Sequence, residues 1–251
     1  MREPLKEFKK DYALTAAGCN AQKQLPLSEL VRQIIETATS HANLLGIGYL
    51  NLIKDNRAWV LGRLTIEINR MPEMHQSYSL KTWIEGFNRH FSKRNFELAN
   101  LEGENIGYAT TVWSTINPET RQPADLSSIE NIDELILART IPIEPQSRIK
   151  PVENPEIEKV YPVQTTDIDF NRHVTTAKYV ELAENQLPLD FYDNNSLVRF
   201  EMSFHQEAKW GERLQIQSSF LQENILSTEI KNEAGISICS CKMIFREKNR
   251  L

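Results

Sequence analysis

The segment "LSELVRQIIETATSHANLLG", residues 27–46, combines apolar residues at helical spacing with a glycine near its end. Its apolar positions are Leu30, Val31, Ile34, Ile35, Ala38 and Ala42. This spacing predicts an amphipathic helix, and Ser28 is a suitable N-cap. Strand-like runs follow: "AWVLGRLTIEINRM", "YSLKTWIEGF" and "SKRNFELANLEGENIGYATTVWSTI". Short Gly/Asn turns between them predict an antiparallel meander.

The second half of the chain repeats this order. "TTAKYVELAENQL" has helical spacing, and "LVRFEMSFHQEA", "ERLQIQSSFLQ", "ILSTEIKNE" and "ISICSCKMIFRE" are strand-like. Between the halves, prolines cluster in residues 141–162, where they exclude a regular helix or a central strand. We therefore predict an N-terminal unit (1–140), a linker (141–158) and a C-terminal unit (159–251). One helix followed by a long meander predicts a sheet wrapped around that helix, an α+β architecture.

Composition excludes several classes of function. The chain has 251 residues, 40% hydrophobic and 25% charged, which is typical of a globular protein. A formal charge of −5 argues against general nucleic-acid binding. No apolar run approaches the ~20 residues of a membrane span, and the start lacks a signal-peptide core. The three cysteines fit neither a disulfide framework nor a zinc site. We expect a cytoplasmic protein without a cofactor, a metal or a membrane contact.

A second stretch, "TTDIDFNRHVTTAKYVELAE" (165–184), places Asp169, Asn171 and His173 on alternate positions before the second helix. A calcium loop beginning at Asp167 fails, because its sixth position is Arg172 and its twelfth is Lys178. Two interpretations remain open on the residues alone. One is a polar turn whose threonines cap the helix. The other is a catalytic cluster that combines a water-activating base with oxyanion-binding groups.

The same stretch resembles a family motif. "DIDFNRHVTTAKYVE" is similar to the D-x-N-x-H-V-N-N-x-K-Y motif of the acyl-acyl carrier protein (acyl-ACP) thioesterases of plants and bacteria. "SHANLLGIG", "LKTWIEGF", "FSKRNFEL" and "ATTVWSTINPETRQPADL" also look like stretches of the N-terminal half of that family. The resemblance covers roughly residues 8 to 246. It implies a double hotdog fold, an acyl-binding N-terminal unit and hydrolysis of the thioester that ends fatty-acid elongation.

The resemblance also implies the site residues. Asp169, Asn171 and His173 match the catalytic D-x-N-x-H, and Glu207 in "SFHQEAKWG" matches the catalytic glutamate. In the implied mechanism Glu207, assisted by His173, deprotonates water. Asn171 and the backbone N–H near Val174 hold the oxyanion, and Asp169 orients Asn171 or His173. Strict strand alternation, however, puts Glu207 on the polar face of its strand unless a bulge re-aims it.

Two departures from the family pattern are visible. Thr175 and Thr176 replace an Asn-Asn pair, and Ala208 stands where some members have a cysteine. The alanine leaves no thiol nucleophile at this position, so water is the expected nucleophile.

The implied partner is acyl carrier protein, which is acidic and needs a local basic surface. Candidates near the site are Arg148, Lys150, Arg172, Lys178, Lys209 and Arg213. An acyl-CoA thioesterase of the same fold and a non-catalytic acyl-binding hotdog protein are the alternatives, and a monomer and a homodimer are both compatible with the sequence.

Overall fold

The computed structural model describes residues 5–129 and 131–248, and it divides into two compact units. The first comprises Met1–Thr15 and Gln33–Glu144, and the second comprises Ala16–Arg32 and Pro145–Leu251. The division in the middle of the chain lies within the linker expected from the prolines. Residues 16–32, which the sequence analysis assigns to the first half, belong instead to the second unit.

The first unit is an antiparallel sheet with one long helix. Its strands follow the order β1-β3-β4-β5-β2, and β6 pairs with β5. They are β1 (Glu7–Ala13), β2 (Ala58–Ile68), β3 (Ser77–Phe87), β4 (Ser92–Asn100), β5 (Asn105–Ile116) and β6 (Pro123–Ala124). The helices are α1 (Leu27–Leu44), which begins in the second unit, α2 (Tyr49–Leu52), η2 (Ile53–Asp55), η3 (Leu126–Ser128) and η4 (Ile132–Leu135).

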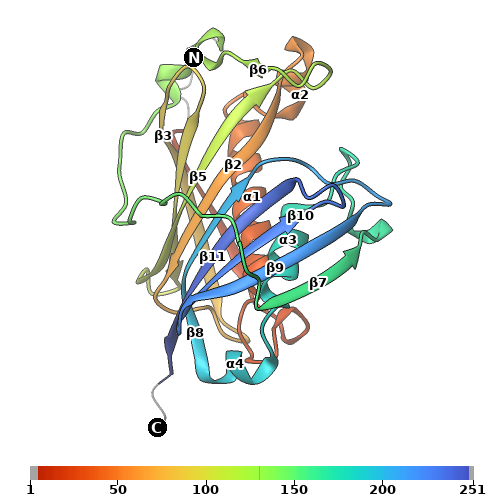
Figure 1. Ribbon diagram of the computed structural model, residues 1–251. Helices are drawn as coiled ribbons and strands as arrows, with labels where there is room; N and C mark the ends of the chain where they lie inside the picture. Colours follow the sequence, from red (N-terminus) through yellow and green to blue (C-terminus); the bar gives the residue numbers. More distant parts are fainter. Residues whose placement is uncertain (1–4, 130, 249–251) are drawn as a thin grey trace. The chain divides into compact units, whose positions relative to one another are not determined.

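The second unit repeats the design, with strand order β8-β11-β10-β9-β7. Its strands are β7 (Ile157–Pro162), β8 (Asn195–Phe204), β9 (Arg213–Gln222), β10 (Ile225–Lys231) and β11 (Ser237–Glu247). Its helices are η1 (Ala16–Gly18), η5 (Thr165–Asp167), α3 (Thr176–Glu184) and α4 (Leu189–Asn194). In Figure 1, α1 and α3 each run along a face of strands. The α+β expectation is confirmed, and no helix of the described residues is long and apolar enough to cross a membrane.

One strand was not expected. β1 has the charged sequence "EFKKDYA" and forms the edge of the first sheet, paired antiparallel with β3. Lysines at positions 9 and 10 are typical of an edge strand, because their charges oppose pairing with another chain. The charges hide the strand from a search for alternating apolar residues.

Helix α1 is fixed to the first sheet by buried polar contacts as well as by apolar packing. The hydroxyl of Tyr78 donates to Oε1 of Gln33 at 2.6 Å, and the hydroxyls of Tyr12 and Thr37 lie 2.8 Å apart. Ile34 and Leu80 are fully buried. Each polar pair has one member on the helix and one on a strand, so the pairs fix the rotation of the helix on the sheet.

A buried His–Arg pair lies at the end of this helix. Nη1 of Arg94 is 2.8 Å from Nδ1 of His41, whose Nε2 lies 2.7 Å from the carbonyl oxygen of Leu5. Burial and the neighbouring guanidinium lower the pKa of His41 to about 4, and burial lowers the pKa of Arg94 to about 9. The imidazole is therefore neutral near pH 7, with Nδ1 accepting from Arg94 and Nε2 donating to Leu5.

The N-cap prediction for α1 was wrong. The helix begins at Leu27, so Ser28 lies inside its first turn, and Leu30 N–H donates to the carbonyl of Pro26. Backbone N–H groups of Leu27 and Ser28 donate instead to the carboxylate of Glu184, at the end of α3. A carboxylate satisfies these first-turn donors and interacts favourably with the positive end of the helix dipole.

The buried carboxylate predicts a measurable pH dependence. Burial raises the pKa of Glu184 from 4.5 to about 7, although the two N–H donors oppose the shift. The folded state therefore binds a proton that the unfolded state has lost, and this group's contribution to stability decreases as pH rises from about 4.5 to about 7. Urea unfolding of wild type and Glu184→Gln at several pH values tests this. The free-energy difference, wild type minus variant, should become more favourable to wild type as pH falls through that window, and a constant difference would contradict the assignment.

Candidate active site

The loop before α3 is built around the carboxylate of Asp167, which is 1% exposed. Its Oδ2 accepts from the hydroxyl of Tyr161 at 2.9 Å and from the N–H of Gln164 at 2.8 Å. Its Oδ1 lies 3.2 Å from Nζ of Lys178. The backbone carbonyl of Asp167 accepts from the N–H of Thr175 at 2.9 Å. One residue thus ties β7, the loop and α3 together.

Asp169 closes a tight turn within this loop. Its Oδ1 accepts from the N–H groups of Asn171 at 2.8 Å and His173 at 3.1 Å. Its carbonyl accepts from Arg172, which has φ +68°. Asp169 therefore positions Asn171 and His173 through their backbone, not through their side chains. The side chain of Asn171 is exposed at the tip of the turn.

The segment that follows His173 pairs with the residues after Glu207. The N–H of Val174 donates to the carbonyl of Ala208 at 2.9 Å, and His173 forms an antiparallel bridge with Lys209. The hydroxyl of Tyr179, on α3, accepts from the N–H of Ala208 at 3.0 Å. Burial raises the pKa of this phenol, so it stays neutral. These bonds hold residues 173 and 207 beside each other.

Glu207 is brought to His173 by a β-bulge. Strand β8 ends at Phe204, and the next two N–H groups, of His205 and Gln206, both donate to the carbonyl of Ile238. Two residues of one strand that lie opposite a single residue of the neighbouring strand form a β-bulge, which changes the alternation of side chains beyond it. Oε2 of Glu207 then lies 3.2 Å from Nε2 of His173, with side-chain exposures of 31% and 20%. Strict strand alternation does not extend to Glu207, because the regular strand ends at Phe204.

The four predicted residues therefore lie in one region of the second unit, but with different roles in its geometry. His173 and Glu207 are in direct contact, Asp169 supports the turn, and Asn171 presents its amide at the turn tip. The prediction that a backbone N–H near Val174 binds the oxyanion was wrong. Its N–H already donates to Ala208, and the N–H of Thr175 donates to Asp167. The side-chain amide of Asn171 is the remaining expected donor.

Two supporting residues were not predicted from the sequence. Lys178 was expected only as a surface cation, and Tyr179 had no expected role. The structure shows Lys178 paired with the buried Asp167 and Tyr179 bonded to Ala208. Their adjacent positions in the family's K-Y pair were the available signal. Thr175 caps α3 by accepting from the N–H of Lys178, as predicted. Within residues 5–129 and 131–248, no cluster of three or more His, Cys, Asp or Glu side chains could hold a metal.

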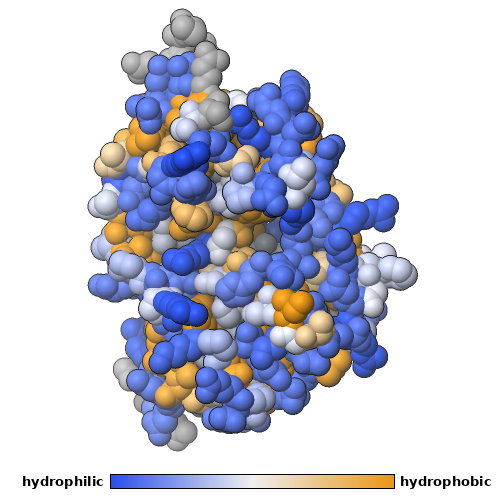
Figure 2. Space-filling model, turned by 45° about the horizontal axis from the view of Figure 1, so that its top comes forward, coloured by the Kyte–Doolittle hydropathy of each residue, from blue (hydrophilic) through white to orange (hydrophobic). Residues whose placement is uncertain are grey.

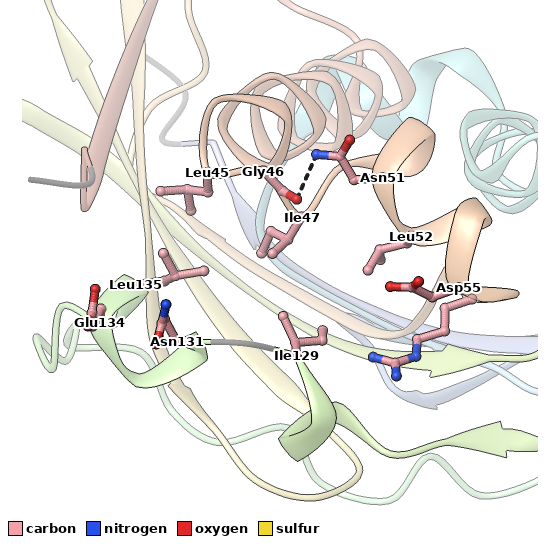
Figure 3. Close-up of a pocket in the computed structure, with 11 residues that line it drawn as sticks. Leu45, Gly46, Ile47, Asn51, Leu52, Asp55, Ile129, Asn131, Glu134 and Leu135 are labelled. Carbon is pink, nitrogen blue, oxygen red and sulfur yellow. Dashed lines mark hydrogen bonds between the residues drawn. The ribbon is translucent and has the colours of Figure 1, made fainter. Parts of the chain in front are cut away.

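A cavity of about 490 Å³ lies within the first unit. Figure 3 shows residues from the end of α1, from α2 and η2, and from the segment around η4 surrounding it. Its apolar lining is Leu45, Ile47, Leu52, Ile129 and Leu135, and its polar lining includes Asn51, Asp55, Arg57, Asn131 and Glu134. The cavity is thus lined by both apolar and polar side chains.

The turn after α1 forms one wall of this cavity. Gly46, at φ +76°, donates to the carbonyl of Asn43, and Ile47 donates to the carbonyl of Ala42. This is a Schellman motif, which uses glycine because the position requires a left-handed backbone. Ile47 then packs with Ala42, Ile84 and Leu135, and the indole N–H of Trp59 donates to its carbonyl at 2.9 Å.

The role of Asp167 predicts the effect of one substitution. Asp167→Asn keeps the shape but removes the charge that Lys178 and two other donors contact, so we expect a loss of about 2 kcal/mol in the free energy of unfolding. Urea denaturation measures it. Asp193→Asn, at an exposed carboxylate that accepts from Gln22, is the matched control and should change stability by less than about 0.5 kcal/mol. Equal effects in both variants would show that the loop does not depend on Asp167.

Comparison with known proteins identifies the family. The acyl-ACP thioesterase N-terminal domain matches residues 5–132, and the acyl-ACP thioesterase C-terminal domain matches residues 150–247. A curated relative, the chloroplastic palmitoyl-acyl carrier protein thioesterase of Gossypium hirsutum, is 22% identical over 252 residues. That alignment covers 95% of this chain but 60% of the relative, so the chain spans about three fifths of that protein's length.

Solved structures agree in fold. The crystal structure of an acyl-ACP thioesterase from Bacteroides thetaiotaomicron has 32% identity and a TM-score of 0.90, covering 98% of this chain and 100% of that one. The 12:0-ACP thioesterase of Umbellularia californica has 16% identity and a TM-score of 0.86, covering 96% and 94%; at this identity the likeness concerns the fold alone. The double hotdog expectation is confirmed. Together, the two matched domains and the full-length structural relative show that this chain belongs to the acyl-ACP thioesterase family.

Proposed function

We propose that this protein hydrolyses the thioester of a fatty acyl chain carried on acyl carrier protein, which releases the free fatty acid. Family membership supports the reaction class. The observation that carries the proposal is the 3.2 Å contact between His173 and Glu207, which are partly buried beside the turn of Asn171. A carboxylate and an imidazole in contact form a general-base pair that can activate water.

In the proposed reaction the carboxylate of Glu207 accepts a proton from water while the water oxygen attacks the thioester carbonyl carbon. Nε2–H of His173 holds the carboxylate in position. The tetrahedral intermediate then collapses, the C–S bond breaks, and the proton on Glu207 passes to the departing sulfur. The products are a fatty acid and the free thiol of the carrier. Water is the nucleophile in this route, so no covalent acyl-enzyme forms. Ala208, which is fully buried, offers no thiol for one at its position.

The amide of Asn171 is proposed to donate to the carbonyl oxygen as it gains negative charge. Its position depends on the turn closed by Asp169 and on the left-handed backbone of Arg172. A donor that is already oriented stabilises the intermediate without reorganisation. Asp169 is therefore a positioning residue, and His173, Asn171 and Glu207 are the groups proposed to touch the reacting atoms.

Two variants test this mechanism. We expect Asn171→Ala and Glu207→Gln each to lower kcat by about 10²–10³-fold, as for loss of an oxyanion donor or a general base. The assay is hydrolysis of one acyl chain presented on acyl carrier protein and on coenzyme A. Circular dichroism and thermal melting of each variant show whether it is folded.

The His173–Glu207 pair has a sharper test in a double-mutant cycle. If the two groups act as one unit, His173→Gln combined with Glu207→Gln lowers kcat little more than either change alone. Multiplicative losses would overturn the pairing. Preference for the coenzyme A substrate would favour an acyl-CoA thioesterase, and acyl binding without turnover would favour a binding protein.

We also propose that the cavity of the first unit receives the acyl chain. Its support is the apolar lining of Leu45, Ile47, Leu52, Ile129 and Leu135. Methylene groups gain free energy in such surroundings, about 0.8 kcal/mol each when buried. The size of the cavity would then limit the length of the chain.

Chain-length preference tests this assignment. Ile129 lines the cavity and is only partly buried, so Ile129→Trp should narrow the space and shift turnover towards shorter acyl chains, while Ile129→Ala should shift it towards longer ones. The readout is kcat/KM over a series of acyl-ACP substrates. Leu50→Trp is the control, because Leu50, on α2, is 73% exposed and does not line the cavity. An unchanged preference in both Ile129 variants would remove the acyl chain from this cavity.

A further inference from the structure

Two exposed aromatic side chains lie beside the proposed catalytic residues and have no part in the mechanism. Phe170 is 76% exposed and Trp210 is 68% exposed. Phe170 directly precedes Asn171, and Trp210 lies three residues after Glu207. On the face drawn in Figure 2, hydrophilic residues cover most of the surface and hydrophobic ones occur in small groups. Exposed rings on both chain segments of one site therefore need an explanation.

Both rings are held on tight turns. Phe170 is in the turn closed by the bond from Arg172 N–H to the carbonyl of Asp169. Trp210 is in a turn closed by the bond from Glu212 N–H to the carbonyl of Lys209, and Gly211 has φ +89°. A residue with a Cβ atom is strained at that φ, so the glycine allows the turn that exposes Trp210.

The two turns are neighbours. His173 and Lys209 form an antiparallel bridge, and Val174 N–H donates to Ala208. In an antiparallel pair the residues before 173 and the residues after 209 leave the bridge at the same end, so the two turns lie at one end of it. These two neighbouring turns carry two exposed rings and two exposed cations, those of Arg172 and Lys209.

Two of the other predicted cations are already in ion pairs. Lys178 pairs with Asp167 and Glu181, and Arg213 lies 3.9 Å from Glu233. Arg172 and Lys209 are exposed, and neither belongs to an ion pair with another described residue. Their charges are available to an anionic ligand, in a chain whose formal charge is −5.

We propose that Phe170, Arg172, Lys209 and Trp210 form the subsite for the phosphopantetheine arm of the acyl carrier protein. This rests on the proposed function, because the arm carries the thioester to His173 and Glu207. The rings contact the dimethyl group and the amide planes of the pantetheine part. Arg172 and Lys209 bind the phosphate that joins the arm to the carrier. Coenzyme A has the same arm, so it is the second source of this chemistry.

Truncated substrates test the subsite. One acyl chain is presented as the thioester of N-acetylcysteamine, pantetheine, phosphopantetheine, coenzyme A and acyl carrier protein, and kcat/KM is measured for each. In Trp210→Ala, the advantage of the pantetheine thioester over the N-acetylcysteamine thioester should fall about 3- to 10-fold. In Arg172→Gln combined with Lys209→Gln, the advantage of phosphopantetheine over pantetheine should fall about tenfold.

The matched control variants remove side chains of the same kind, one apolar and one cationic, elsewhere in the second unit. Leu221→Ala removes an exposed apolar side chain, and Arg246→Gln removes an exposed cation, and both ratios should stay at their wild-type values. Unchanged ratios in the Trp210 and Arg172–Lys209 variants would overturn the subsite. Equal losses on all five substrates would also overturn it, because the residues would then act on the reaction and not on the arm.

A binding measurement separates this proposal from the catalytic one. Calorimetry compares wild type with carrier protein that has the arm (holo) and that lacks it (apo). Holo protein should bind more tightly, and Trp210→Ala should remove most of that difference. This result would support the subsite even if no thioester were hydrolysed. Equal affinity of wild type for holo and apo protein would overturn it. If the Trp210 and Arg172–Lys209 variants lowered kcat/KM for the coenzyme A substrate but not for the carrier-protein substrate, the bound arm would be that of coenzyme A. This result would contradict the carrier-protein source.

Discussion

The buried carboxylate of Asp167 is the contact on which the arrangement of the second unit depends. A charged group that is 1% exposed is stable only when donors surround it. Tyr161, Gln164 and Lys178 supply those donors from three places along the chain. With the loop fixed in this way, the turn at Asp169 and the first residues of α3 have defined positions. The proposed chemistry uses other residues, but their geometry rests on this one.

Supporting contacts on both sides of the site follow the same logic. Lys178 and Tyr179 are consecutive on α3, yet one holds the loop before the helix and the other holds Ala208, next to Glu207. Consecutive residues on a helix point about 100° apart, so one turn of helix can contact two separate segments. The helix thereby fixes the separation between His173 and Glu207. A side-chain pair whose support comes from backbone hydrogen bonds is well suited to a site that must not relax during a reaction.

Much of the fold could be predicted because it follows from periodicity. The long apolar stripe of α1 and the alternating strands of both sheets appear where the sequence predicts them. Strand β1 was missed because an edge strand is protected by charge rather than marked by apolar residues. The cap of α1 was missed because Glu184 lies far along the chain, and no local pattern reveals a distant partner.

In the site, too, some features could be predicted from the sequence and others could not. Asp169, Asn171, His173 and Glu207 could be named from a motif, since a motif needs only spacing. The side on which Glu207 lies depends on two N–H groups that share the carbonyl of Ile238, a feature of the sheet that spacing does not reveal. The backbone donor near Val174 was assigned wrongly because its hydrogen bond goes to a segment more than thirty residues away.

The capping of α1 by Glu184 has a consequence for the order in which the chain acquires structure during translation. Residues 16–32 leave the ribosome early, but their unit is completed by residues 145–251. Because a domain folds as a unit and synthesis runs from the N-terminus, the first turn of α1 must wait for this C-terminal part of the chain. The nascent protein would therefore keep that helix end open until Glu184 has been made, and a chain arrested before this point would lack the anion that closes it.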